Sequence, residues 1–433
     1  MPPVERLIIR NGRLIDPASQ RDTHTDLYLA DGQIVALQHP PADFSPDRII
    51  DAQGQIVCPG LIDLCARLRE PGLEHKADIA SETRAAAANG ITTLLIPPDT
   101  DPVIDEPAVV ELIRRRSEAA GQARVYTLGA LSHGLQGEQL AEIAALREAG
   151  CVGVSNALHP ISNTLVLRRC LEYAATFDLT VFLNPVDPWL AANGCAHDGQ
   201  VAARLGLNGI PVAAETTELA RILALVADVG VRAHIGRLSS ASGATLIERA
   251  KADGLPVSAD VSAHQLHLTE IDLERFDSRC HVLPPLRGQR DKDALRAQLA
   301  SGVIDALCSD HQPHEAGAKE DTFSATAAGI SGLDTLLPLG LRLVADGVLD
   351  LSGLITRLSW QPAQILNLPF GRLDVGDPAD VCIFTPERYK QLSPENWHSH
   401  GQNSPFMGWE LPGQVSHTLL AGRVVYQAEV ARQ

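Results

Sequence analysis

Asp310 lies in a short stretch, 309–314 (SDHQPH), that is rich in groups able to ligate metals or transfer protons. Carboxylates and imidazoles are typical ligands of catalytic zinc, which uses about three protein ligands and a water. A second stretch places Cys65, Arg67 and Arg69 at alternate positions. Cys65 can ligate zinc as a thiolate, whereas arginine stays protonated and offers no lone pair to a metal. Permanent cations on alternate positions beside the one possible ligand are unfavourable for binding a metal at this second stretch.

Two further histidine pairs elsewhere in the chain are candidate metal ligands. His264 and His267 are three residues apart, and we interpret them as one structural and one surface residue. His398 and His400 form a His-x-His pair within 386–415, a stretch rich in Pro, Ser, Asn and Gly that is typical of a linker. We interpret this second pair as part of a solvated loop. Neither pair predicts a new metal site.

The elements that position these residues alternate between strand-like and helical patterns. Helical apolar spacing occurs at 137–149, followed by Gly150, and at 214–229. Eight such repeats over about 300 residues predict a (β/α)8 TIM barrel, whose active sites lie at the carboxyl ends of the strands. A doubly wound sheet is the alternative, but it has fewer units, and the chain has no Gly-x-Gly-x-x-Gly or Walker lysine loop. The strand-like runs are 61–66, 91–96, 124–130, 151–155, 179–184, 231–237, 255–261 and 303–308.

Both ends of the chain have the pattern of short β-strands. Runs rich in β-forming residues are separated by the turn pairs Asn11-Gly12 and Asp31-Gly32 near the start. Similar runs return at 380–384, 418–420 and 423–426. We therefore predict a small β-sandwich built from both termini. The predicted division is 1–58 and 367–433 for the β domain and 59–366 for the barrel.

Composition restricts the class of protein. The 433 residues are 45 % apolar and 21 % charged, and the net charge of −17 disfavours binding to nucleic acid or to an anionic membrane. No apolar run reaches the roughly 18 residues of a membrane span, and the segment 1–6 lacks a signal-peptide pattern. Eight scattered cysteines without Cys-x-x-Cys spacing are typical of reduced thiols. We expect a cytoplasmic protein without a nucleic-acid or membrane partner.

Several motifs in order carry a resemblance to a known family. The stretch 58–72 (CPGLIDLCARLREPG) resembles the opening motif of dihydroorotases. The chain is similar to dihydroorotases and to the wider cyclic amidohydrolases over nearly its whole length. The resemblance implies the barrel fold and, for active members, zinc-dependent hydrolysis of a cyclic amide. The further landmarks are GITT at 90–93, DTDP at 99–102, PPLR at 284–287, SDHQPH at 309–314, QPA at 361–363 and GDPAD at 376–380.

The resemblance also implies where the family's zinc ligands should stand. The His-x-His pair of the first strand is replaced by Cys65 and Arg67, and the carbamylated lysine or aspartate of the fourth strand by Asn156. Histidines at the ends of strands five and six are replaced by Asn184 and Arg237. Only Asp310 matches the family, so we expect no metal and no other cofactor. Arg67 and Arg237 are predicted to supply the positive charge that the metals would provide.

The family's substrate positions are also changed. Arg69 and His314, which the resemblance assigns to the dihydroorotate carboxylate, are both present. Asp99 stands where the family has asparagine, and an acid there would repel an anionic substrate. Leu283 replaces the asparagine before Pro-Pro-Leu-Arg. Substrate recognition is therefore expected to be compromised.

Two functions of different class follow from the resemblance. The first is a pseudoenzyme, a catalytically inactive dihydroorotase homologue. It would act as a structural subunit for the aspartate carbamoyltransferase catalytic chain in pyrimidine biosynthesis, as a homodimer within a larger hetero-oligomer. The alternative is a divergent amidohydrolase of dihydroorotase, hydantoinase or allantoinase type. In that case, hydrolysis with no metal or one metal would depend on Asp310 as the base.

Overall fold

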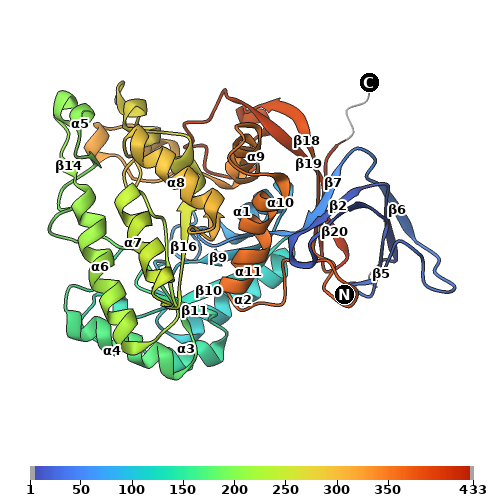
Figure 1. Ribbon diagram of the computed structural model, residues 1–433, viewed down its shortest axis with the longest axis horizontal. Helices are drawn as coiled ribbons and strands as arrows, with labels where there is room; N and C mark the ends of the chain where they lie inside the picture. The colour runs from blue at the N-terminus through green and yellow to red at the C-terminus, as the bar shows by residue number, and fades with distance from the viewer. Residues whose placement is uncertain (1–4, 430–433) are drawn as a thin grey trace.

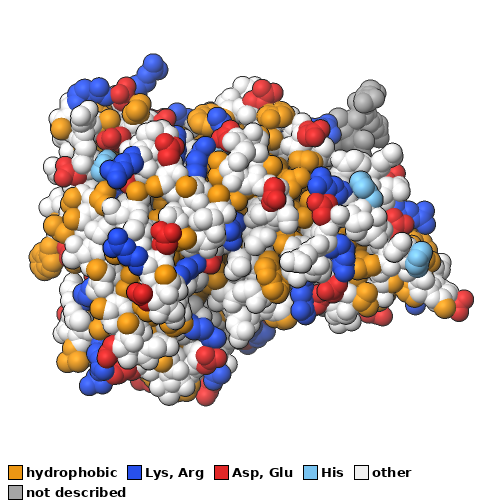
Figure 2. All heavy atoms as spheres, in the orientation of Figure 1, with side chains coloured by type: hydrophobic (Ala, Val, Ile, Leu, Met, Phe, Trp, Pro, Cys, Tyr) orange, Lys and Arg blue, Asp and Glu red, His pale blue; other side chains and the backbone are white. Residues whose placement is uncertain are grey.

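The computed structural model describes residues 5–429. Residues 1–4 and 430–433 lie outside the described residues; they include most of the segment that lacks a signal-peptide pattern and the outer ends of the predicted β domain. Figure 1 shows two regions, a barrel surrounded by helices and a layered β region that contains strands from both ends of the chain. None of the helices within 5–429 has the length and apolarity needed to cross a membrane. Acidic and basic side chains are interspersed on the face seen in Figure 2.

Eight parallel strands form the barrel, in the order β17-β16-β15-β12-β11-β10-β9-β8. An isolated parallel bridge between Ala66 and His311 joins the two ends of this order. The predicted fold is therefore confirmed, and every barrel strand overlaps its predicted run. The strands are β8 (Leu61–Asp63), β9 (Ile91–Ile96), β10 (Arg124–Ala130), β11 (Gly153–Ser155), β12 (Thr180–Leu183), β15 (Ala233–Ile235), β16 (Val257–Ser262) and β17 (Ala306–Cys308).

Helices follow the barrel strands and pack outside them (Figure 1). The predicted helix at 137–149 is wrong in its first half, because Leu140 forms an antiparallel bridge to Ser132 and the helix begins at Ile143. The predicted helix at 214–229 begins two residues earlier. The helices are α1 (Ile79–Ala88), α2 (Pro107–Ala120), α3 (Ile143–Ala149), α4 (Thr164–Thr176), α5 (Gln200–Leu205), α6 (Val212–Val229), α7 (Ala241–Ala252), α8 (Gln289–Ser301), α9 (Leu336–Ala345), α10 (Leu351–Ile355) and α11 (Gln361–Ile365).

Two sheets form the β region, with strand orders β5-β4-β1-β6 and β20-β19-β18-β7-β2-β3. Their facing side chains share one buried apolar cluster that includes Leu7, Leu27, Val57, Val381 and Leu419. The prediction of a β domain from both termini is confirmed. Its strands are β1 (Leu7–Arg10), β2 (Arg13–Asp16), β3 (Arg21–His24), β4 (Leu27–Ala30), β5 (Gln33–Leu37), β6 (Arg48–Asp51), β7 (Ile56–Pro59), β18 (Val381–Gln391), β19 (Glu410–Leu420) and β20 (Arg423–Gln427).

The stretch 386–415 is not a linker. Its two ends belong to the paired strands β18 and β19, and only 392–409 is a loop. The outer half of β18 is polar and largely exposed, so its sequence lacks the apolar alternation of a half-buried strand. The loop packs back on the barrel, because the backbone N–H of His400 and the Ser399 hydroxyl both donate to the buried Glu82 carboxylate. The side chains of His398 and His400 remain on the exposed side of this loop.

Candidate functional site at the carboxyl end of the barrel

Closure of the barrel brings the two chemically rich stretches together. The Arg67 N–H donates to the His311 carbonyl over 2.9 Å, and the His311 N–H donates to the Cys65 carbonyl over 3.1 Å. This short ladder aligns the end of β8 with the end of β17. As a result, Asp310 Oδ1 lies 3.5 Å from both Cys65 Sγ and Arg67 Nη1.

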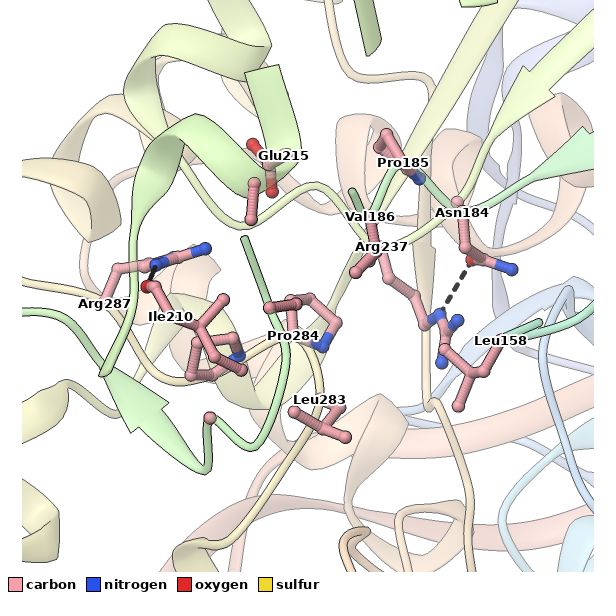
Figure 3. A pocket seen from close by; sticks show the side chains of 15 residues that line it. Leu158, Asn184, Pro185, Val186, Ile210, Glu215, Arg237, Leu283, Pro284 and Arg287 are labelled. Carbon is pink, nitrogen blue, oxygen red and sulfur yellow. Dashed lines mark hydrogen bonds between the residues drawn. The ribbon is translucent and has the colours of Figure 1, made fainter. Parts of the chain in front are cut away.

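Arg237 approaches the same carboxylate from the end of β15. Its backbone has a φ of 58°, in the left-handed region that is uncommon for residues other than glycine. The Arg237 N–H donates to Asp260 Oδ1 over 2.6 Å, which holds this turn. The side chain then reaches Asp310 Oδ1 through Nη1 at 3.1 Å. Its Nε donates to Asn184 Oδ1 over 3.0 Å (Figure 3). Two guanidinium groups therefore share one carboxylate oxygen.

Asp99 adds a second negative charge to this cluster. Arg67 Nε donates to Asp99 Oδ2 over 2.8 Å, and the two side chains are only 6 % and 17 % exposed. Burial would raise the pKa of Asp99, but the neighbouring Arg67 holds that pKa below its ordinary value. Burial would likewise lower the pKa of Arg67, but Asp99 and the other acidic neighbours raise it above its ordinary value. Both groups are therefore charged at neutral pH.

This set of groups does not fit the zinc that the family implies. Burial and the adjacent Asp310 raise the pKa of the Cys65 thiol, so a metal would have to displace its proton. Both arginines contact the one expected carboxylate ligand. Within 5–429, no three His, Cys, Asp or Glu side chains gather into a possible metal site. A metal ion would have to lie beside two permanent cations with too few ligands.

Asn156 does not join the cluster. Its Oδ1 accepts from the Ser132 hydroxyl over 2.8 Å, and its Nδ2 donates to the carbonyls of Leu135 and His159 over 3.1 and 2.7 Å. These bonds fix the loops that follow β10 and β11. Asn184 reaches the cluster through Arg237, while its Nδ2 donates to the Ala157 carbonyl. Five of the six positions predicted for the metal site thus form one connected group, and Asn156 braces neighbouring loops.

The four predicted substrate positions are divided among three environments. Arg69 Nη2 lies 3.1 Å from His314 Nε2, and Arg69 Nε donates to the Pro313 carbonyl. Burial, together with Arg69 and Lys76, lowers the pKa of His314 to about 3, so its ring is neutral at pH 7. Asp99 is bound to Arg67. Leu283 lines a separate cavity beyond Arg237 (Figure 3).

Sequence reasoning missed two polar residues that complete the cluster. Gln312 Nε2 donates to Asp310 Oδ1 over 3.2 Å. Asp260, on β16, accepts from the Arg237 N–H and lies 2.9 Å from His234 Nε2. The sequence carried a signal for Asp260. It stands two residues after Ser258 on β16, and successive inward-facing positions of a barrel strand are two apart.

The surroundings of His264 and His267 differ in part from the prediction of one structural and one surface residue. His264 is buried, and burial lowers its pKa to about 4. His267 is only half-buried, but it is not a free surface residue, because its Nε2 lies 3.0 Å from the Leu339 carbonyl. Burial and the nearby Arg296 lower the pKa of His267 to about 3. Both rings therefore have structural surroundings.

The fold and the arrangement of this site at the strand ends are those of an amidohydrolase barrel. A family described as "Dihydro-orotase-like" matches residues 54–242, and one described as "Amidohydrolase family" matches 196–425. The chain belongs to the dihydroorotase-like amidohydrolases.

Relatives match along almost the whole chain. It is 52 % identical over 419 residues to a "Dihydroorotase-like protein" of Pseudomonas aeruginosa, covering 97 % of this chain and 99 % of the relative. It is 40 % identical over 422 residues to a "Dihydroorotase" of Geobacter sp. strain M21, covering 98 % and 99 %. Among solved structures, the L-hydantoinase of Arthrobacter aurescens is 25 % identical with a TM-score of 0.87, covering 98 % of this chain and 96 % of that one.

Proposed function

We propose that this chain is a catalytically inactive dihydroorotase homologue that supports aspartate carbamoyltransferase as a structural subunit in the cytoplasm. The single observation that carries the proposal is the contact of Arg67 and Arg237 with Asp310. Hydrolysis in this family needs a metal-activated water, because zinc lowers the pKa of bound water from 15.7 to about 7. Two guanidiniums provide positive charge to Asp310 but have no open coordination position.

The partner is proposed from the resemblance and from the intact scaffold around the changed site. All eight barrel strands and both sheets of the β region are retained. A protein whose role is to hold a partner needs this framework and its outer surface, and does not need the metal. We propose that a homodimer of the chain assembles with the catalytic chain of aspartate carbamoyltransferase in a larger hetero-oligomer.

The direct test mixes the purified chain with its cognate aspartate carbamoyltransferase and measures mass by light scattering after size exclusion. A mixed complex with higher carbamoyltransferase activity than the partner alone is expected. Cys65→Ser is the matched variant, because it removes the remaining thiol ligand while leaving both arginine–Asp310 contacts in place. The variant should assemble and activate like the wild type. Absence of a complex at micromolar concentrations of both proteins would contradict the proposal.

Metal content provides a second, independent test. The chain is soaked in zinc at neutral pH, desalted and analysed by atomic emission. Less than about 0.1 zinc per chain is expected, because a catalytic site needs about three protein ligands. Stoichiometric zinc that is lost in Cys65→Ser would show that the chain holds a zinc site that includes Cys65, and would contradict the proposal.

A divergent amidohydrolase is the second candidate. It is favoured by the 40 % identity to a protein named "Dihydroorotase" and by Asp310 Oδ2, which is buried without a hydrogen-bond partner in 5–429. Such an oxygen could accept a proton from water. Turnover of dihydroorotate or a hydantoin that disappears in Asp310→Asn but persists in Cys65→Ser would favour metal-free catalysis over the structural role.

A further inference from the structure

A cavity of about 120 Å³ lies next to the ion-pair cluster, between the loop after β12 and the segment 283–287 (Figure 3). Its walls are mainly apolar and include Leu158, Ile210 and Leu283. Arg237 and Asn184 form one end. Arg69 and His314, the positions assigned to the family's substrate carboxylate, do not line it. The cavity is therefore distinct from that pair.

Hydrogen bonds within the chain hold the far wall of this cavity in place. The Glu215 carboxylate accepts from the hydroxyls of Ser239 and Ser240. Arg287 donates through Nε to the Ser239 hydroxyl over 3.1 Å and through Nη1 to the Ile210 carbonyl over 2.5 Å. Glu215 is therefore occupied by its own neighbours, and Arg287 fixes the backbone that carries Ile210. The apolar wall exists before any ligand binds.

Arg237 presents the polar group of the cavity. Its Nε is bonded to Asn184 and its Nη1 to Asp310, whereas Nη2 has no hydrogen-bond partner within 5–429. Nη2 is not fully enclosed by the described residues, so it is open to solvent or to the cavity. Nη2 is therefore the charged donor that this end of the cavity offers to a ligand, and a carboxylate could accept from it.

We propose that this cavity binds a small apolar ring that carries one carboxylate, with the ring between Leu158, Ile210 and Leu283 and the carboxylate on Arg237 Nη2. The volume of about 120 Å³ allows no more than a single ring, because an apolar cavity of about 150 Å³ accommodates benzene. The ring is apolar because the polar side chains on the far wall are already bonded within the chain. This site is independent of the proposed function and requires neither catalysis nor a partner protein.

Benzoate is the probe, titrated into the full-length wild-type chain by calorimetry at pH 7.5. A dissociation constant of about 0.1 mM is expected for a ligand of this size. Benzamide, which has the same shape without the charge, should bind about tenfold more weakly, because a charge-assisted bond to Arg237 is lost. Equal binding of benzamide and benzoate would overturn the assignment of the carboxylate to Arg237.

The location is tested with two adjacent alanines of one loop. Ala191 lines the cavity, and Ala192 is exposed and does not line it. Ala191→Phe fills the space and should weaken benzoate at least tenfold, whereas Ala192→Phe should bind like the wild type. Equal binding by wild type and Ala191→Phe, or no binding at 5 mM benzoate, would refute the site. Tighter binding of dihydroorotate than of benzoate would also refute it, because a polar ring would then be preferred.

Discussion

Arg237 Nη1 lies 3.1 Å from Oδ1 of Asp310, and both side chains are almost fully buried. Arg67 contacts the same oxygen and is itself held by Asp99. The charges are thus balanced inside the barrel mouth by side chains of the protein itself. Removing one partner of a buried ion pair is costly, because the remaining charge is left without compensation.

Replacement of Arg67 by methionine should therefore destabilise the protein strongly. Asp99 would lose the guanidinium that is bonded to it, and Asp310 would lose one of the two guanidiniums that contact it. We expect a loss of about 3–5 kcal/mol in the free energy of unfolding, measured by urea denaturation at pH 7. The loss should diminish in acid, because burial would then raise the pKa of Asp99 without opposition from Arg67, and protonation would remove the unpaired charge.

Arg114→Met is the control for this prediction. Arg114 also pairs with two acidic residues, but on the exposed face of α2. Exposed pairs of this kind contribute little to stability. We expect no measurable change in the unfolding midpoint. If Arg67→Met behaves like Arg114→Met, the arginines do not replace the charge of a metal.

Asn156→Asp should destabilise the fold without improving zinc binding. The Asn156 amide donates to two carbonyls, and a carboxylate can only accept, so two favourable bonds would become repulsive contacts. A loss of roughly 2–3 kcal/mol is expected from thermal unfolding of the two proteins. Asn184→Asp is the comparison, since Asn184 donates to one carbonyl and accepts from Arg237. Zinc uptake by Asn156→Asp would contradict the observed orientation of this side chain.

His314 should make the protein sensitive to mild acid. Burial and the nearby cations lower its pKa to about 3 from an ordinary 6.5, so below pH 6.5 the unfolded chain binds a proton that the folded chain does not. Stability is therefore lost as pH falls from 6.5 towards 3. Between pH 6.5 and 5, His314→Gln should lose roughly 1.5 kcal/mol less than the wild type.

The measurement for His314 is the pH dependence of thermal unfolding in both proteins. His159→Gln is the control, because His159 is exposed on its loop. It should show the same pH slope as the wild type. Equal slopes for wild type and His314→Gln would mean that the His314 ring is protonated in the folded protein at these pH values.

Glu82→Gln should loosen the 392–409 loop. The buried Glu82 carboxylate accepts from Ser399, from the His400 backbone and from the His311 ring. A glutamine amide would place a donor against one of these donors. Hydrogen exchange in 392–409 should become at least tenfold faster, while Glu395→Gln, an exposed change in the same loop, should leave it unchanged. Unchanged exchange in Glu82→Gln would mean that other contacts hold the loop.

The barrel could be predicted because each strand carries its own local pattern. Buried parallel strands are short apolar runs, and those at 91–96 and 124–130 match β9 and β10 residue for residue. Strand ends were predicted less exactly, since β8 ends at Asp63 and the predicted run extends to 66. The predictions for 137–141 and for the outer half of β18 were wrong. In both segments, tertiary pairing determines the backbone conformation and the side-chain pattern does not.

For the candidate site, the sequence could predict which residues lie near one another but not how their side chains are oriented. The motif spacing brought Arg67, Arg237 and Asp310 together, because residues at the carboxyl ends of barrel strands must share one opening. The direction of Asn156 depends on carbonyls of two loops, which spacing along the chain does not reveal. The role of Gln312 was hidden for a similar reason, since it reaches back to a residue only two positions away.

The six-stranded sheet places β7, just before the barrel, beside β18, just after it. About 320 residues must be synthesised between these two strands. At roughly 5–20 residues per second, β7 waits on the order of 15–60 s for its neighbour to leave the ribosome. During that interval, the edge of β7 that β18 will cover, including Val57 and Cys58, has unpaired backbone groups. Biogenesis of this protein therefore includes a period in which the β7 edge stays uncovered until the whole barrel sequence has been synthesised.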